Sequence, residues 1–116
     1  MEISRERFEE LVAEALDTIP DELARRVQNL VVLVEEEPPP GEPRDLLGMY
    51  DGVALTERGG GYAGMLPDRI FIFRGPLMEM CQDEAELIDE VRITVVHEVA
   101  HHFGIDEATL HRLGWG

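Results

Sequence analysis

The residues best suited to chemistry stand at positions 97–101, which read His-Glu-Val-Ala-His. In a helix, His97 and His101 are one turn apart and therefore lie on the same face. This spacing allows two imidazoles to bind one zinc ion, and the carboxylate of Glu98 beside them can act as a general base. The pattern therefore predicts a zinc site of the hydrolytic kind.

A third metal ligand is expected just after this helix. Gly104 follows His101 by three residues and allows a left-handed turn that brings the chain back toward the helix. Six residues after His101 stands an acid, Glu107, and this spacing favours it as the third ligand, with Asp106 or His111 as alternatives. Three protein ligands leave one position for water, which is typical of a catalytic zinc site and not of a closed structural one.

Each candidate also has an ordinary structural role. Paired helix histidines can be solvated or hydrogen-bonded in a core, although an interior pair needs partners that a metal supplies. An Asp cap followed by Glu, as at Asp106 and Glu107, is common at the start of a helix. His111 fits the solvent side of that helix, and His102 is offset by one residue from the expected ligands. We therefore expect His102 at the surface.

The residues around the motif predict the elements that hold it. Apolar residues recur at helical spacing over residues 83–103, so a long helix is expected to start at an Asp83 cap and to carry the motif near its end. Gly104 supplies the stop, and a short helix over residues 107–113 starts from Asp106. One more helix and three strands are expected upstream, the helix over residues 4–18 and the strands over residues 27–34, 47–55 and 69–74.

Two stretches between these elements are expected to be loops. Residues 35–45 contain three consecutive prolines, which remove hydrogen-bond donors and prevent regular structure. Residues 59–64 are rich in glycine but lack the lysine and the glycine spacing of phosphate-binding loops. The order of a helix, then strands, then helices indicates an α+β fold, with a small mixed sheet and helices packed on one face.

The composition narrows the class of protein. The 116 residues, 44% of them hydrophobic, suit a single domain over residues 1–116. A net charge of −15 argues against nucleic acid or an anionic membrane as a partner. No apolar run is long enough to span a membrane, and the acidic N-terminal residues are unlike a signal peptide. The single cysteine, Cys81, excludes an intrachain disulfide, so a soluble cytoplasmic protein is expected.

At this point the sequence resembles the zincin-like metallopeptidases, and most closely their short bacterial members, the mini-zincins, whose pattern is His-Glu-x-x-His-x-x-Gly-x-x-Asp. Residues 97–115 carry most of the resemblance. Residues 50–59 and 66–70 also look like the family, so the similarity covers nearly the whole chain. The chain departs from the pattern at the third ligand, because Glu107 stands where the family has aspartate. Asp106 offers the shorter side chain one residue earlier, and either carboxylate can reach the metal.

The resemblance implies a zinc-dependent metallopeptidase of minimal zincin fold, in which a small mixed sheet packs on an active-site helix that carries His97 and His101. Zn2+ is the implied cofactor. Glu98 is the implied general base, which takes a proton from the attacking water and returns it to the leaving amine. The candidates for stabilising the oxyanion are Tyr50, Tyr62 and His111.

The implied substrate is a peptide or protein, whose identity the sequence leaves open. In zincins an edge strand pairs with extended substrate, and residues 69–74 are the candidate, although they can equally form a central strand. The alternative function is a zincin-fold module that binds metal or a protein partner with weak or no hydrolysis, because the chain is short for a substrate cleft. Strand edges that need cover also make a homodimer an option.

Overall fold

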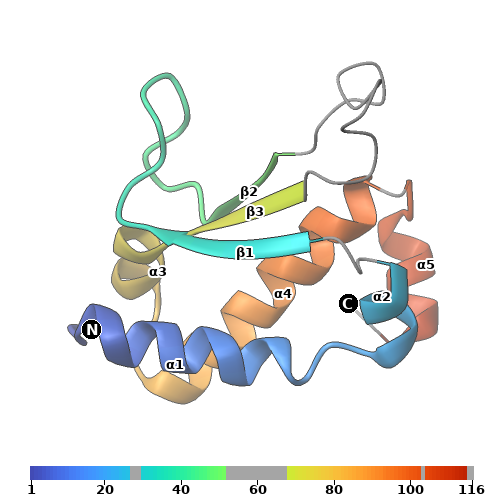
Figure 1. Cartoon of the computed structure of the whole chain (residues 1–116), viewed down its shortest axis with the longest axis horizontal. Coiled ribbons are helices and arrows are strands. Elements are labelled where there is room, and N and C mark those ends of the chain that lie inside the picture. Colours follow the sequence, from blue (N-terminus) through green and yellow to red (C-terminus); the bar gives the residue numbers. More distant parts are fainter. Residues whose placement is uncertain (27–29, 52–67, 103, 115–116) are drawn as a thin grey trace, which may run out of the picture.

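The computed structural model describes residues 1–26, 30–51, 68–102 and 104–114. Parts of three expected elements, residues 27–29, 52–55 and 103, lie outside these ranges, as does the glycine-rich stretch 59–64. Within them the elements follow in the order α1 (Arg5–Leu16), α2 (Asp21–Arg26), β1 (Leu30–Glu35), β2 (Gly48–Asp51), β3 (Asp68–Phe73), α3 (Arg74–Met80), α4 (Glu84–His102) and α5 (Glu107–Leu113) (Figure 1).

Capping side chains determine where three helices begin. The side chains of Ser4, Asp83 and Asp106 each accept a hydrogen bond from a backbone N–H in the first turn that follows, over 3.1, 2.8 and 2.8 Å. These bonds satisfy donors that the first turn of a helix leaves without a partner. The caps at Asp83 and Asp106 are those that the sequence predicts. Gly104 has φ +72°, which confirms the predicted left-handed turn after α4.

Two short helices stand where the sequence predicts none. Helix α2 directly follows Pro20, whose carbonyl accepts a hydrogen bond from the Ala24 N–H over 2.9 Å. Helix α3 begins at Arg74, which was expected to end a strand. Pro76 is tolerated in α3 because the first-turn N–H groups have no partner within a helix. Both helices are too short for apolar periodicity to reveal them.

The three described strands form a mixed sheet in the order β1-β3-β2. Strand β1 pairs with β3 in parallel, and β2 pairs with β3 in antiparallel orientation. The α+β class and the mixed sheet are therefore confirmed. Of the two positions left open for residues 69–74, edge or centre, the structure has the central one, because β3 lies between the other two described strands. Its full burial at Ile70 and Ile72 agrees with a central position.

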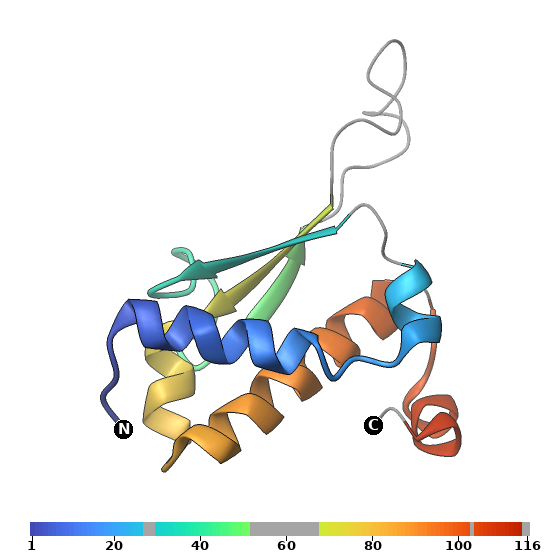
Figure 2. The same ribbon diagram turned by 60° about the horizontal axis from the view of Figure 1, so that its bottom comes forward.

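The helices cover one face of this sheet. Figures 1 and 2 show α1 and α4 side by side on the same face, and α4 contacts both β2 and β3. The core is largely aliphatic and contains one buried phenylalanine of α1; its largest fully buried members are Phe8, Leu11, Leu23, Ile70, Ile72, Leu77, Leu87 and Leu110. Within the described ranges, no helix combines the length and the apolar character that a membrane span requires.

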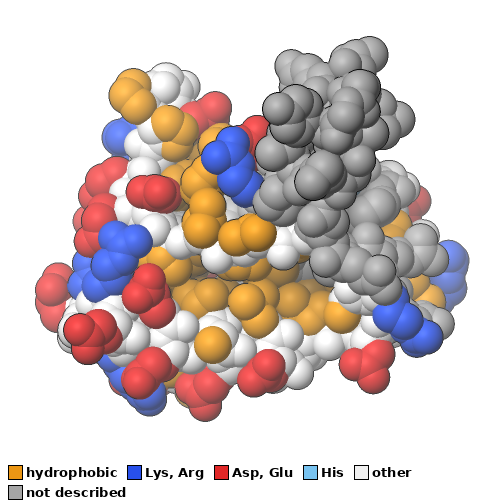
Figure 3. Space-filling model, in the orientation of Figure 1, with side chains coloured by type: hydrophobic (Ala, Val, Ile, Leu, Met, Phe, Trp, Pro, Cys, Tyr) orange, Lys and Arg blue, Asp and Glu red, His pale blue; other side chains and the backbone are white. Residues whose placement is uncertain are grey.

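The two edges of the sheet have different surroundings. At the β1 edge, apolar side chains line an open groove of about 410 Å³ between β1 and α1, visible at the centre of Figure 3. Val12 and Leu16 of α1 and Val32 of β1 lie in it. At the β2 edge, α4 packs directly against the strand. The His97–His101 motif of α4 therefore lies on the side of the sheet where β2 forms the edge.

Gly48 allows this close packing of β2 on α4. A Cβ atom at Gly48 would lie 2.5 Å from Cγ2 of Thr94 and 3.0 Å from the carbonyl oxygen of Phe71. Neither distance is acceptable without movement, so a side chain at this position would separate the strand from the helix.

We expect Gly48→Ala to lower the free energy of unfolding by about 1–3 kcal/mol, the usual cost of overpacking. Urea denaturation measures the loss. In Gly48→Ala/Thr94→Ser the clashing methyl is absent while the hydroxyl can still donate to the Glu90 carbonyl, a bond of 2.8 Å, so part of the stability should return. An equal loss of unfolding free energy in the single and double variants would show that the contact with the Thr94 methyl does not set the distance between β2 and α4.

Candidate metal centre

Helix α4 carries both motif histidines in its last two turns, as the sequence predicts. Val95, Val96, Val99 and Ala100 are at most 1% exposed and anchor this part of the helix in the core. The remaining faces carry the polar residues. His97 and Glu98 are half-buried, whereas His101 and His102 are exposed. The burial of the apolar face therefore places the motif at the rim of the core.

Helix α5 returns Glu107 to α4. After the left-handed turn at Gly104, the Ile105 N–H donates to the Ala100 carbonyl over 2.8 Å and holds the returning chain. As a result, Oε1 of Glu107 lies 3.7 Å from Nδ1 of His97. Two atoms that each bind zinc at its usual distance and tetrahedral angle are about 3.4 Å apart. The spacing of this pair is thus close to that of two zinc ligands.

The carboxylate of Asp106 has a different partner. Its Oδ1 accepts the Thr109 N–H over 2.8 Å and caps α5. Hydrogen bonds from Thr109 hold the pKa of Asp106 below its usual range, because they favour the charged form. Of the two acids weighed from the sequence, Glu107 is the one that lies against His97. The third candidate, His111, is exposed in the last turn of α5.

Glu107 and His97 form a pair, but the described side chains do not assemble a complete set of ligands. Among the residues that the structure describes, no three His, Cys, Asp or Glu side chains are grouped closely enough to hold a metal ion. Two imidazoles and a carboxylate are nevertheless the donor types that catalytic zinc sites use. The residues therefore fit zinc by chemistry, and their joint coordination stays a prediction.

The Glu98 carboxylate is influenced both by the motif histidines and by the backbone of β2. Burial raises the pKa of its carboxyl above the ordinary value, while His101, the backbone N–H of Tyr50 and His97 act in the opposite direction. The carboxylate of Glu98 is thus near both imidazoles and is hydrogen-bonded to β2. A half-buried carboxylate that is held by a backbone donor is suited to exchange a proton at a defined place.

A polar cluster adjoins Glu98 where β2, β3 and the end of α4 meet. We call Tyr50, Asp68 and His102 the Tyr50 cluster. The Tyr50 hydroxyl donates to Oδ2 of Asp68 over 2.6 Å. The ring of Tyr50 stacks on that of His102, with centroids 4.1 Å apart and planes 13° apart, and Nε2 of His102 lies 3.7 Å from Oδ2 of Asp68.

This cluster changes the interpretation of two residues. Tyr50 was a candidate for stabilising the oxyanion, but here its hydroxyl is bonded to Asp68. His102 is exposed, as expected, yet it contacts both other members of the cluster. These contacts join residues far apart in the chain, so no local pattern indicated them. Of the other two oxyanion candidates, His111 is exposed on α5 and Tyr62 lies outside the described residues.

A groove of about 400 Å³ opens beside His97 and Glu98. One wall is α4 and the other is the chain that leads into β2. The described lining contains the carboxylates of Asp45 and Glu90 as well as apolar side chains, and no lysine or arginine. Its residues are Pro43, Asp45, Leu46, Leu47, Gly48, Glu90, Ile93, Thr94, His97 and Glu98.

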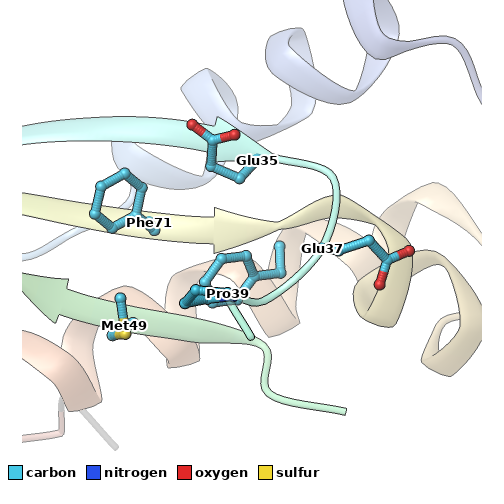
Figure 4. A pocket seen from close by; sticks show the side chains of 6 residues that line it. Glu35, Glu37, Pro39, Met49 and Phe71 are labelled. Carbon is cyan, nitrogen blue, oxygen red and sulfur yellow. The ribbon is translucent and has the colours of Figure 1, made fainter. Parts of the chain in front are cut away.

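A separate pocket of about 350 Å³ lies on the other face of the sheet (Figure 4). Met49 and Phe71 point into it from paired positions of β2 and β3, and Glu35, Glu37 and Pro39 border it. Successive side chains of a strand point to opposite faces, so this pocket is separated from α4 by the sheet. Its lining includes no residue of the motif.

Comparison with known proteins gives two similarities. A family model described as zincin-like metallopeptidase matches residues 27–115. Among solved structures, a conserved hypothetical protein (TTHA0227) from T. thermophilus shares 30% sequence identity with a TM-score of 0.63, over 87% of this chain and 94% of that chain. No curated protein matches the chain.

Substitution of the two acids should distinguish the ligand from the cap. Glu107→Ala is expected to lower zinc affinity by more than the roughly 10–100-fold that loss of an outer-shell partner costs. Asp106→Ser keeps a capping oxygen and should bind zinc like the wild type. Competition with a chromogenic chelator measures the zinc affinity of both variants. The reverse result, with weak binding only in Asp106→Ser, would identify Asp106 as the ligand.

Proposed function

This chain belongs to the zincin-like metallopeptidase family, and on that premise we propose that it is a zinc-dependent peptidase in which His97, His101 and Glu107 hold the metal. The observation that supports this most directly is the 3.7 Å approach of Glu107 to His97 across the turn at Gly104. His101 stands one helical turn after His97 and completes a set of two imidazoles and a carboxylate.

The chemistry is divided between the metal and Glu98. Zinc bound here would lower the pKa of its water to about 7 and would polarise the carbonyl of the substrate. The carboxylate of Glu98 accepts the proton of the attacking water and delivers it to the nitrogen of the leaving amine. The Tyr50 N–H orients this carboxylate, and half-burial limits its access to bulk water.

The position of the groove supports an extended peptide as substrate. Strand β2 is an edge of the described sheet, and Gly48 at its start lines the groove together with His97 and Glu98. A peptide in the groove can pair with the start of β2 at Gly48 through backbone hydrogen bonds while one of its bonds faces Glu98, and the Tyr50 N–H farther along the strand stays on that carboxylate. In this proposal β2 takes the role that the sequence suggested for residues 69–74.

The second candidate function is a module of the same fold that binds metal or a protein partner without efficient hydrolysis. Two observations favour it: His101 is exposed, and no three potential ligands are grouped within the described part of the chain. The two functions differ in what Glu98 does, because a binding module has no use for a general base.

Zinc analysis of protein purified without chelators or a histidine tag should give about one zinc per chain, and His101→Ala should lose it. Glu98→Gln should keep zinc and lose peptide hydrolysis by about 10²–10⁴-fold, because the amide cannot accept the proton. Glu14→Gln, on the exposed side of α1, is the matched control.

The outcomes separate the alternatives. Zinc binding without cleavage of a peptide library by the wild type would support the binding module. Equal cleavage by wild type and Glu98→Gln would remove Glu98 as the base, and absence of zinc after saturation would overturn the zinc site.

The groove should also favour basic substrates. A lysine or arginine side chain can place its stem on Ile93 and Leu46 and its charge near Asp45 and Glu90. Exposed ion pairs are weak, so we expect Asp45→Asn/Glu90→Gln to reduce the preference for an arginine-containing over a glutamate-containing peptide by about twofold to tenfold in kcat/KM. An unchanged ratio would place the charged substrate residue elsewhere.

A further inference from the structure

The end of α4 needs support from outside the helix. His101, a proposed zinc ligand, stands in the last turn, since α4 ends at His102. The last four carbonyls of a helix lack partners within it, and helix ends fray. In α4 the turn that follows supplies two partners, the Ile105 N–H for the Ala100 carbonyl and the Gly104 N–H for the His101 carbonyl, but these bonds do not tie the turn to the sheet. A ligand in this position keeps a fixed geometry only if other elements hold the last turn.

The motif contains two residue pairs with the same spacing. His97 and His101 are one turn apart, and so are Glu98 and His102. Successive residues of an α-helix are rotated by about 100°, so the second pair forms a row beside the first. The first row contains the proposed ligands. The second row faces β2, since the Tyr50 N–H bonds to Glu98 and the Tyr50 ring stacks on His102.

Tyr50 therefore connects both members of the second row. Its backbone N–H holds the Glu98 carboxylate, and its ring covers His102 one turn later. The Tyr50 hydroxyl is in turn bonded to Asp68 at the start of β3, over 2.6 Å. The Asp68 side chain is only 13% exposed and its Oδ2 also lies 3.7 Å from Nε2 of His102, so one largely buried carboxylate faces both residues of the stacked pair.

We propose that the Tyr50 cluster is a positioning device that fixes the last turn of α4 and the Glu98 carboxylate relative to the sheet, and through them the geometry of the zinc site. Tyr50, Asp68 and His102 act through Glu98 and His101 and are positioning residues. The inference rests on the proposed function, because it assigns the cluster a role in zinc binding and hydrolysis.

The test compares variants that remove or preserve single contacts. His102→Ala removes the stacked ring, and His102→Phe keeps one. Tyr50→Phe keeps the ring but removes the hydrogen bond to Asp68. Asp51→Asn is the matched control, because it breaks the neighbouring ion pair with Arg69 across the same two strands without touching Glu98.

Zinc affinity is measured by chelator competition, and kcat and KM with a library peptide, well below the unfolding temperature of each variant. We expect His102→Ala to weaken zinc binding by about 10-fold and to lower kcat by about 10–100-fold with little change in KM, as for loss of outer-shell support. His102→Phe should recover part of both losses, Tyr50→Phe should be intermediate, and Asp51→Asn should resemble the wild type.

The outcomes separate this inference from the proposed function. If the wild type binds zinc and hydrolyses peptide but His102→Ala and Tyr50→Phe behave like Asp51→Asn, the positioning role is wrong and the peptidase remains. If the wild type binds zinc without hydrolysis, the zinc affinities of the variants alone decide whether the Tyr50 cluster has a positioning role. A wild type that binds no zinc overturns the proposed function and this inference with it. Circular dichroism checks folding, and Tyr50→Phe, which removes one oxygen atom, serves if His102→Ala fails to fold.

Discussion

Leu87, Val91, Val95 and Val99 recur at helical spacing along α4 and are at most 1% exposed. Their burial against α1 and the sheet fixes the rotation of α4 about its axis, because turning the helix would expose this apolar row to water. Once the rotation of α4 is fixed, the directions in which the polar residues of the motif point are fixed as well. The two rows of the motif must lie at the rim of the core, with the row of Glu98 and His102 against β2.

The approach of β2 is the second constraint. Gly48 allows the strand to contact Thr94 without a side chain between them, and the strand then reaches the last turn of α4 at Tyr50. The same strand borders the groove and hydrogen-bonds to Glu98. One short edge strand therefore serves both the proposed substrate path and the proposed general base. An opening between β2 and α4 would disturb both at once.

Local signals in the sequence determined much of this protein. The helical spacing of apolar residues, the Asp83 and Asp106 caps and the glycine after His101 predicted α4, its end and the start of α5, because periodicity, capping and left-handed turns depend on neighbours within a few residues. The same stretch predicted the family, and the match over residues 27–115 confirms it. The set of zinc ligands depends on where side chains from two helices meet, which neighbouring residues in the chain do not determine. This set therefore stays a prediction.

The tertiary structure alone decided the contacts between distant segments. Residues 69–74 read equally well as an edge or a central strand, and only the pairing of β3 with both β1 and β2 placed it in the centre. Likewise, Tyr50 and His102 carry no signal for each other across 52 positions, yet their rings stack. The choice of Glu107 over Asp106 beside His97 also required the returning α5. The physical reason is common to all three. Sequence patterns report the energy of local conformations, whereas strand order and the meeting of side chains depend on which arrangement of whole elements buries the most apolar surface.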